Sequence, residues 1–552
     1  MLTARGITRV LGGNVVLDDV SCTVGARTRL GVVGRNGVGK STLLRVLAGA
    51  EPADSGVVER NPPELTIGYL PQEPDTVPGE TLRAYLSRRT GVAAAETELD
   101  ALTDALASDS AAVDRYSAAL ERYLALGGDD FGARVGVVCA DVGLPSDRLD
   151  VDMTALSGGQ AARAALAAIL LSRVDVLLLD EPTNNLDFAG LDRLERFLAD
   201  RSGGLVVVSH DRAFLDHAVD RMLELHEETH RATEIAGGWS AFVAARALAR
   251  GQQLAAHEKY RAQREELLDR GRRQRQWSET GVRKVNRSGE SDKHLRYRKT
   301  QRSEKQAAKV RTTERRLERL AVVEKPWEGW QLRMQLASKS RSGDVVSRLS
   351  GAVVERGAFR LGPVDVEIGW QDRVALLGPN GSGKSTLLGA MLGRIPLVAG
   401  ERWLGPGVVV GEMDQSRAAY SSSAPVLEVL VADTGLRIDE ARSLLAKFGL
   451  GADAVTRRGE HLSPGERTRA VLASLMARGV NFLVLDEPTN HLDVDAIEQL
   501  ETALDDYDGT LLVVTHDRWL LDTLKLTHEI ELELGGAGET VTEPALRWGS
   551  AR

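Results

Sequence analysis

Two stretches of this chain read almost identically: LLLDEPTNNLD at residues 177–187 and LVLDEPTNHLD at residues 483–493. Each is an apolar run that ends in Asp-Glu. Such a run is typical of a buried strand whose last acids lie at the carboxyl edge of a parallel sheet, where ligands bind. The repeat therefore predicts two α/β modules in tandem, each with a polar site at a sheet edge.

A glycine-rich loop precedes each repeat. GRNGVGKS at residues 34–41 and GPNGSGKS at residues 378–385 match G-x-x-x-x-G-K-[ST], and each follows an apolar, strand-like run (29–33 and 373–377). Glycines let backbone N–H groups approach phosphates at a helix N-terminus, so two matches in this context predict two ATP sites. The expected nucleotide-binding residues are Gly34, Asn36, Gly37, Gly39, Lys40, Ser41 and Thr42, and then Gly378, Asn380, Gly381, Gly383, Lys384, Ser385 and Thr386.

Oxygen-bearing side chains near these loops predict a Mg²⁺ ion in each site, because Mg²⁺ prefers oxygen ligands and accompanies ATP. The candidate ligands are Ser41, Gln72 and Asp180 in the first module and Ser385, Gln415 and Asp486 in the second. The serines follow the loop lysines, and the aspartates end the apolar strands. Gln72 and Gln415 follow short apolar runs, and for them a solvated loop glutamine is a nearly equal interpretation.

Glu181 and Glu487 follow the strand aspartates and are positioned to polarise an attacking water. His210 and His516 each stand 29 residues after the glutamate, at the end of a β-branched run. A lone histidine there would usually be structural. The equal spacing in both modules instead predicts contact with the γ-phosphate or the water, so all four residues are candidate catalytic groups.

A second pair of short motifs lies 24 residues before the glutamates: SGGQ at residues 157–160 and SPGE at residues 463–466. Serine is a good N-cap, and the following residues open a helix whose N–H groups can face an anion. The motifs predict a second phosphate-binding surface formed by Ser157, Gly159, Gln160, Ser463, Gly465 and Glu466. Pro464 suits the first turn of a helix but removes one N–H donor.

The first module is longer than the second. Lys40 and Ser157 are 117 residues apart, whereas Lys384 and Ser463 are 79 apart, so the first module holds 38 extra residues. Residues 82–127 are rich in Ala, Leu, Glu and Asp and predict an inserted helical arm that ends at Gly127-Gly128. We expect domains at residues 1–242 and 326–552, joined by a linker at 243–325.

The linker is strongly basic. From Ala244 to Lys325 it holds 24 Lys and Arg against 11 Asp and Glu, a net of +13 in a chain of net −9, which leaves −22 for the rest. Helix formers at residues 243–268 and 299–320 predict a long helical hairpin, with residues 277–297 as its turn. The candidate RNA-binding residues are Trp277, Arg283, Lys284, Arg287, Lys293, Arg296, Arg298 and Lys299. By composition alone, a solvated coiled coil with surface arginines explains the linker equally well.

Bulk composition limits the alternatives. At 552 residues the chain is too long for one core, and no apolar run approaches the ~18 residues of a membrane span. Cys22 and Cys139 are the only cysteines, which favours reduced thiols over a disulfide. The N-terminal residues MLTAR lack the apolar core of a signal peptide, so we expect a cytoplasmic protein.

Taken together, these motifs resemble the ATP-binding-cassette superfamily: the loops resemble Walker A, SGGQ the signature, Asp180-Glu181 Walker B, and Leu186-Asp187 and Leu492-Asp493 the D-loops. Two cassettes around a basic helical linker resemble the ABC-F family. The resemblance implies an ATP hydrolase and a monomer in which two ATP molecules are sandwiched head-to-tail between the cassettes.

The resemblance also implies a partner and a site of action. ABC-F proteins bind the ribosome, with the linker in the tRNA exit site near ribosomal RNA and P-site tRNA and the arm near the stalk. Some members relieve stalled translation, and others protect the ribosome from antibiotics. Cassettes usually stack adenine on an aromatic residue ahead of Walker A: Phe359 fits this role in the second module, whereas Val10-Leu11 occupies the expected place in the first.

Two other functions compete with this one. The chain could be the ATP-binding subunit that energises a membrane exporter, which would need a groove for transmembrane partners and gives no reason for a linker of net +13. It could also be a DNA-associated ATPase, although the sequence has neither zinc cysteines nor a long coiled coil. The ribosome-directed ATPase accounts for both the cassettes and the linker.

Overall fold

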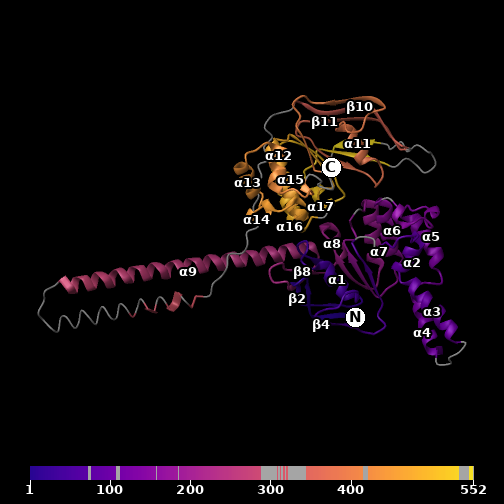
Figure 1. The fold of residues 1–552 in the computed structure, drawn as a ribbon, viewed down its shortest axis with the longest axis horizontal. Helices are drawn as coiled ribbons and strands as arrows, with labels where there is room; N and C mark the ends of the chain where they lie inside the picture. The colour runs from indigo at the N-terminus through magenta and orange to yellow at the C-terminus, as the bar shows by residue number, and fades with distance from the viewer. Residues whose placement is uncertain are drawn as a thin grey trace. The chain divides into compact units, whose positions relative to one another are not determined.

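The computed structural model describes most of the chain as two compact units, Met1–Ala241 with Leu332–Arg552, and Phe242–Gln331 (Figure 1). The described residues are 1–72, 76–106, 112–156, 158–184, 186–287, 308, 311–312, 315–317, 319–320, 343–357, 359–413, 420–490, 492–533 and 546–550, with the backbone alone at 274–287, 464 and 546–550. The first unit contains both cassettes, and the second spans the linker expected at residues 243–325.

The first cassette is built on two sheets. A three-stranded antiparallel sheet has the order β2 (Asn14–Val24), β1 (Leu2–Leu11), β4 (Ser55–Arg60). A six-stranded sheet has the order β5 (Ile67–Leu70), β6 (Val176–Asp180), β7 (Gly204–Val208), β3 (Arg29–Val33), β8 (Arg221–Leu225), β9 (Ala232–Ala236), parallel except at β9. Strand β6 is buried along its whole length, as expected for an apolar strand covered on both faces.

Helices follow the strands of this sheet and extend into the insertion. The helices of the first cassette are α1 (Lys40–Ala48), α2 (Leu82–Arg89), α3 (Val92–Leu106), α4 (Ala112–Ala125), α5 (Phe131–Asp141), α6 (Gly158–Leu171), α7 (Phe188–Asp200) and α8 (Arg212–Ala218), with short 3-10 turns at Ser146–Arg148 and Met153–Ala155. The stretch expected to form a helical arm contains α2, α3 and α4, and α3 packs against α4. Gly127, just beyond α4, has a positive φ of 70° and ends this helical run.

The second cassette repeats the plan. Its antiparallel sheet has the order β11 (Phe359–Gly369), β10 (Val345–Arg356), β13 (Ala399–Leu404), and its six-stranded sheet the order β14 (Val410–Met413), β15 (Phe482–Asp486), β16 (Thr510–Val514), β12 (Arg373–Leu377), β17 (His528–Leu532), β18 (Leu546–Ser550). Its helices are α11 (Lys384–Met391), α12 (Val426–Thr434), α13 (Ile438–Lys447), α14 (Ala452–Thr456), α15 (Pro464–Arg478), α16 (Val494–Asp505) and α17 (Arg518–Thr523), with a 3-10 turn at Gly459–His461. The predicted α/β fold of two cassettes is confirmed.

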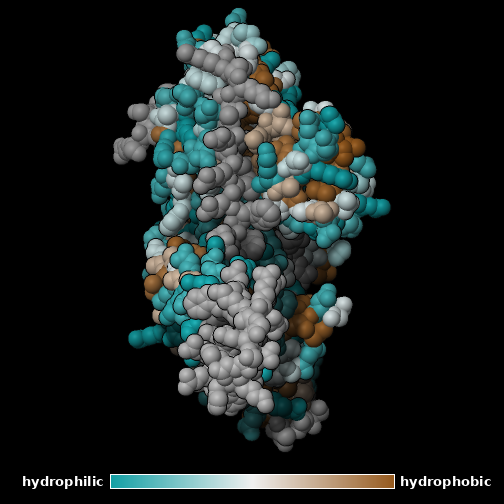
Figure 2. All heavy atoms as spheres, turned by 90° about the vertical axis from the view of Figure 1, so that its left-hand side faces the viewer, coloured by the Kyte–Doolittle hydropathy of each residue, from teal (hydrophilic) through white to brown (hydrophobic). Residues whose placement is uncertain are grey.

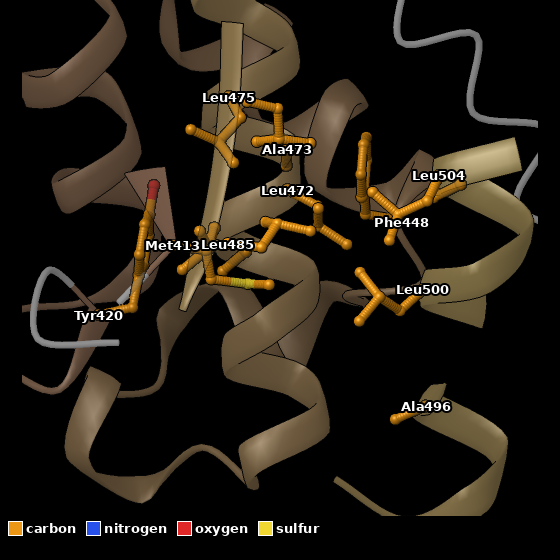
Figure 3. Packing of buried hydrophobic residues seen from close by; sticks show 14 of the residues in the cluster. Met413, Tyr420, Phe448, Leu472, Ala473, Leu475, Leu485, Ala496, Leu500 and Leu504 are labelled. Carbon is orange, nitrogen blue, oxygen red and sulfur yellow. The ribbon is translucent and has the colours of Figure 1, made fainter. Parts of the chain in front are cut away.

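Apolar side chains join the sheet of the second cassette to its helices. In Figure 3, Met413 and Leu485 from two strands lie beside Leu472 of α15, and Leu500 and Leu504 of α16 face Phe448. All six of these leucine, methionine and phenylalanine side chains are almost fully buried. This packing fixes α15 and α16 against the sheet and so sets where the motifs at their N-termini lie.

The linker unit differs from the sequence prediction at one point. Helix α9 runs without a break over Trp239–Arg287, a rise of about 74 Å at 1.5 Å per residue. The turn that we expected to begin at Trp277 is therefore wrong as far as Arg287, because Gly281 and Asn286 are accommodated within the helix. Glycine in a helix costs roughly 1 kcal/mol, which a long helix tolerates. The remainder of the expected turn, and most of the expected return helix, lie outside the described residues.

No helix among the described residues is both long enough and apolar enough to cross a bilayer. On the face of the molecule shown in Figure 2, hydrophilic residues predominate and hydrophobic ones lie in separate small groups. Such scattered groups are normal for the surface of a folded protein.

Candidate nucleotide-binding and hydrolysis sites

Each phosphate loop connects a central strand to a helix, β3 to α1 and β12 to α11. The glycine before each lysine has a positive φ, 111° at Gly39 and 98° at Gly383. A Cβ at Gly39 would lie 2.7 Å from Cγ1 of Val16, and one at Gly383 would lie 2.6 Å from Cζ of Phe359. Only glycine satisfies both the backbone angle and this close approach, so the loops keep their N–H groups open to a phosphate.

The loop lysines are held inside these loops. Nζ of Lys40 donates to the carbonyl oxygens of Gly34 (2.7 Å) and Arg35 (3.1 Å). Nζ of Lys384 donates in the same way to Gly378 (2.6 Å) and Pro379 (3.0 Å). Burial lowers the pKa of both ammonium groups. The two cations are therefore placed where the phosphates of a nucleotide would enter.

The two glutamates adopt a left-handed backbone conformation, with φ of 52° at Glu181 and 47° at Glu487. Each N–H donates to a neighbouring strand, at 2.8 Å to the carbonyl oxygen of Val208 or of Val514. A non-glycine residue with positive φ carries strain that persists only where the surroundings hold it. This turn directs both carboxylates into the cavity described below.

Burial sets the protonation of the glutamate–histidine pairs. It raises the pKa of Glu181 to about 7 and that of Glu487 to about 8. Burial also lowers the pKa of His210 well below its ordinary value and that of His516 to about 4, with a loop lysine adding to each effect. The histidines are thus neutral, and their Nε2 atoms lie 3.3 and 3.5 Å from Oε1 of the glutamates without the alignment of a hydrogen bond. Carboxyl groups with pKa values near neutrality suit general-base catalysis.

Several buried polar atoms of the sites have no hydrogen-bond partner among the described residues. They include Oδ1 of Asp180, Oε1 of Glu181 and both ring nitrogens of His210 and of His516. Buried polar atoms are normally paired, so a cluster of open ones around a phosphate loop indicates the place of a ligand. The Ser41 hydroxyl lies close enough to the Asp180 carboxylate to oppose the rise in the pKa of Asp180 that burial causes, so two oxygen ligands of the kind that Mg²⁺ prefers are near each other. The residues therefore fit Mg²⁺ and ATP.

One cavity of about 1130 Å³ is lined by residues of both cassettes, among them Lys40, Glu181, Lys384 and Glu487. Its size exceeds the roughly 300–1,000 Å³ typical of a site for one small ligand. The four residues come from equivalent positions of the two sheets. The cavity therefore brings both candidate catalytic centres to a shared space.

The D-loop aspartates connect the two cassettes reciprocally. Oδ2 of Asp187 accepts the N–H of Asn380 (2.9 Å), and Oδ2 of Asp493 accepts the N–H of Asn36 (3.3 Å). Each aspartate also caps its own helix, through Gly190 or Ala496. The phosphate loop of each cassette is thus met by the helix start of the other, as head-to-tail pairing requires.

The signature motifs are placed unequally. Gly158, Gly159 and Arg163 of the first motif and its helix line the cavity, whereas Ser157 lies outside the described residues. Among the described residues, Ser463, Gly465 and Glu466 do not line it. The second motif instead forms a capping box. The Ser463 hydroxyl accepts the Glu466 N–H at 3.2 Å, and the Glu466 carboxylate accepts the Ser463 N–H at 2.9 Å.

The surroundings of the adenine also differ. Phe359 lines the cavity with its ring against Gly383, as expected for a stacking platform. In the first cassette Val16 occupies the matching place against Gly39. The sequence pattern predicted Val10-Leu11 at this place and not Val16. Leu11 does line the cavity, but Val10 does not. The spacing to the loop could have identified Val16, which stands 23 residues before Gly39, much as Phe359 stands 24 before Gly383.

The other predicted site residues have mixed outcomes. Gln72 lines the cavity, and Gln415 lies outside the described residues. Trp277, Arg283, Lys284 and Arg287 belong to α9, of which only the backbone is described there, and Lys293, Arg296, Arg298 and Lys299 lie outside the described residues. The nucleic-acid surface thus stays a prediction.

Comparison with known proteins agrees with this geometry. Residues 17–184 and 361–490 match the family model described as ABC transporter. The chain is 34% identical to the tylosin resistance ATP-binding protein TlrC of Streptomyces fradiae, over 97% of each chain. It is 32% identical to the energy-dependent translational throttle protein EttA of Escherichia coli strain K12, covering 95% of this chain and 90% of that one. It is 30% identical to ABC transporter F family member 2 of Arabidopsis thaliana, covering 96% and 76%.

Solved structures share the fold. An RNase-L inhibitor matches 98% of this chain and 90% of its own with a TM-score of 0.58 and 19% identity. The archaeal ribosome recycling factor aABCE1, solved with the stalk protein aP1, matches 98% and 89% with a TM-score of 0.54 and 18% identity. At these identities the likeness concerns the arrangement of strands and helices alone.

Proposed function

Since this chain belongs to the ABC-F family of ATP-binding-cassette proteins and is an ATP hydrolase, we propose that it uses two ATP sites to act on the ribosome. The observation that carries the ATP-gated part of this proposal is the reciprocal contact of Asp187 with Asn380 and of Asp493 with Asn36. These bonds join the cassettes at both phosphate loops. A nucleotide bound at either loop can therefore contact the opposite cassette only when the pair is closed. ATP therefore favours closure, and its hydrolysis removes that preference.

The roles of the site residues follow from their positions. Lys40 and Lys384 bind the β- and γ-phosphates as cations, supported by the N–H groups of the phosphate loops. Glu181 and Glu487 accept the proton of the attacking water, and His210 and His516 orient that water or the γ-phosphate. Mg²⁺ would be held by Ser41 and Asp180 in one site and by Ser385 and Asp486 in the other, where it neutralises phosphate charge.

The position of the first signature motif indicates which ATP site it serves. Gly158 and Gly159 line the cavity that also holds Lys384, so a γ-phosphate on Lys384 would meet the helix start of α6. Ser157 completes that surface in the proposal. Ser463, Gly465 and Glu466 would do the same for the site of Lys40 once ATP is bound. The chemistry thus serves a conformational switch.

The relatives and the linker support the ribosome as the target. EttA is named for throttling translation and TlrC for resistance to tylosin. A linker of net +13 suits RNA, because each phosphate that Lys or Arg neutralises releases counterions. We propose that this cytoplasmic monomer places the linker in the tRNA exit site, against ribosomal RNA and P-site tRNA, and there protects the ribosome from an antibiotic or relieves stalled translation. Trp277 and Tyr297 would stack on unpaired bases.

Sedimentation tests this proposal. With both glutamates replaced (E181Q/E487Q) the chain should bind ATP, hydrolyse it very slowly and pellet with ribosomes, because closure is no longer undone. The matched control K40A/K384A cannot hold the phosphates and should stay in the supernatant. Recovery of the glutamine variant on membranes instead would support the exporter alternative and contradict ours.

The linker has its own test. Replacing Arg283, Lys284 and Arg287 by glutamine should weaken ribosome pelleting. The slope of the logarithm of the affinity against the logarithm of the salt concentration should become shallower by about three. Replacing three exposed arginines of the cassette sheets, Arg221, Arg348 and Arg402, removes the same charge as a control. Cells that express each variant and are challenged with tylosin report protection. Equal loss in both variants would show that total charge, and not the linker, sets the affinity.

A further inference from the structure

One arginine from each cassette contacts the other cassette, and the two arginines stand at equivalent positions. Arg212 stands two residues after His210 and pairs with Glu501 of α16. Arg518 stands two residues after His516 and pairs with Glu195 of α7. The two arginines stand 306 residues apart, and so do the two glutamates. The two histidines are related by the same offset. The same ion pair is therefore made twice between the cassettes.

The first pair, called here the Arg212 clasp, consists of Arg212, Glu501 and Trp519. The guanidinium donates through Nη1 to Oε2 of Glu501 at 2.9 Å and through Nη2 to Oε1, a two-pronged contact. It also lies 5.2 Å from the centre of the Trp519 ring. The side chains of Arg212 and Glu501 are only 3% and 10% exposed. Such a buried, bidentate pair is specific for arginine and poorly screened by salt.

The second pair, the Arg518 clasp, consists of Arg518, Glu195 and Asp192. Nη1 of Arg518 lies 3.0 and 3.3 Å from the two oxygens of Glu195, and Nη2 bonds Asp192. The Arg518 side chain is 30% exposed and that of Asp192 58%. Ala213 stands where the other clasp has Trp519, so there is no ring to cover the cation. Partly exposed pairs of this kind are weaker and respond to salt.

Each clasp connects two parts of one ATP site. Asp211, between His210 and Arg212, caps α8 by accepting the N–H of Phe214 at 2.9 Å. On the other side, Glu501 lies about two turns along α16 from Asp493, which contacts the phosphate loop of the first cassette. The Arg212 clasp thus ties the histidine of the first site to the opposite helix that faces the same site. The Arg518 clasp does so for the second site, through α7 and Asp187.

We propose that Arg212 and Glu501 are positioning residues that lock the Lys40 site shut, and that the Arg518 clasp locks the Lys384 site less firmly, so that the second site opens first. The inference goes beyond the proposed function, because it concerns only the cassette pair and holds whatever that pair acts on. A purely structural pair would stabilise the fold without changing the nucleotide concentration that closes it.

Charge exchange tests the proposal in the full-length E181Q/E487Q chain, which retains bound ATP. The measured quantity is the ATP concentration that half-saturates retention of labelled nucleotide after rapid removal of the free form. R212E and E501R should each raise it at least about tenfold, because each leaves a buried charge unpaired. The exchanged pair R212E/E501R should return it to within about threefold. The exposed pair within one cassette, Arg221 and Glu234, exchanged in the same way, is the control and should change it less than about twofold.

A variant of the second clasp tests whether that clasp is the weaker of the two. R518E should raise the same concentration by only about threefold, and the increase should fade at about 1 M salt, where charges are screened within ~3 Å. The R212E effect should persist there. If R212E does not fold, Arg212→Lys keeps the charge but loses the two-pronged contact, and should give a smaller increase with an unchanged melting temperature.

Two outcomes would overturn the inference. An exchanged pair that performs no better than its single variants would show that the contact is not the cause. Equal effects at Arg212 and Arg518, with equal salt dependence, would remove the order in which the sites open. Neither outcome bears on ribosome binding, which is measured separately by sedimentation.

Discussion

The two cassettes hold the same chemical groups in different surroundings. Glutamate, histidine, D-loop aspartate and crossing arginine all recur at an offset of 306 residues. The platform beside the phosphate loop is Val16 in one cassette and Phe359 in the other. One clasp is buried and the other partly exposed. The groups expected to hydrolyse ATP are therefore the same in both cassettes, and the surroundings expected to hold each nucleotide differ.

The histidines extend the comparison. The ring of Phe188 meets His516 edge-on, with centroids 5.2 Å apart, whereas Val494 stands at the equivalent position beside the first site. An aromatic edge restricts the imidazole more than a valine does. The site of Lys384 thus has an aromatic ring beside its histidine and another beside its phosphate loop, but a more exposed clasp. If the proposed clasps act as we infer, nucleotide binding and site opening should differ between the two sites.

Replacing the two glutamates one at a time tests whether both cassettes hydrolyse ATP equally. If the chemistry is equal, E181Q and E487Q should each lower ATP turnover to a similar extent, and the double variant by roughly 10²–10⁴-fold, the usual worth of a general base. Steady-state phosphate release measures this. The exposed Glu401 of β13, replaced by glutamine, is the control. A single variant that keeps nearly full turnover would show that only one cassette hydrolyses ATP.

The adenine platforms give the next largest effect. Phe359→Ala should weaken ATP binding by about 5- to 100-fold, since a base stacked on an aromatic ring contributes about 1–3 kcal/mol. Val16→Phe should strengthen binding in the first cassette and make the two more alike. Calorimetric titration with ATP measures both, and tripolyphosphate, which has no base, is the control. A loss of tripolyphosphate binding in F359A would show that the ring supports the phosphate loop instead of the base.

The smallest effect concerns Asp211, which caps α8 beside the Arg212 clasp. Burial, and then the Asp517 carboxylate, raises the pKa of Asp211 to about 6. Because this value lies above that of the unfolded chain, the folded chain binds more protons in between, and its stability falls as the pH rises from about 4 to about 6. The cost is fully present at pH 7 and is on the order of 3 kcal/mol.

Asp211→Asn keeps the cap and removes this cost, so it should raise the first melting transition by a few degrees at pH 7 and hardly at all at pH 4. Scanning calorimetry at the two pH values measures the difference, with the exposed Asp104→Asn as control. Asp517→Asn extends the comparison to the second cassette, because burial raises the pKa of Asp517 too. An equal gain for D211N at both pH values would contradict the assignment to its ionisation.

Local pattern predicted the strands and loops of this chain well. The runs at residues 29–33, 176–180, 373–377 and 482–486 are strands with those bounds, because short apolar runs followed by Gly-rich or acidic turns admit few alternatives. The glutamates, histidines and loop lysines follow from them. The sequence predicted two sites for these residues, and the structure places both sets around one cavity.

What failed depended on contacts between distant segments. Nothing near Arg212 or Glu501 in the sequence signals that they meet, because they lie 289 residues apart. Val16 was missed since a valine looks like any strand residue until Gly39 is packed against it. The expected turn at Trp277 failed for a different reason: glycine and asparagine permit a turn without requiring one, and the helix continues to Arg287.

The left-handed backbone at Glu181 and Glu487 has a thermodynamic consequence. A residue with a β-carbon costs about 1 kcal/mol or more in this conformation, while glycine adopts it freely. Replacing either glutamate by glycine should therefore raise the thermal stability of the chain. The same replacement should remove the ATP turnover that depends on that glutamate. A directed-evolution screen that selects only for thermal stability would therefore accept glycine at these two positions and lose ATP turnover.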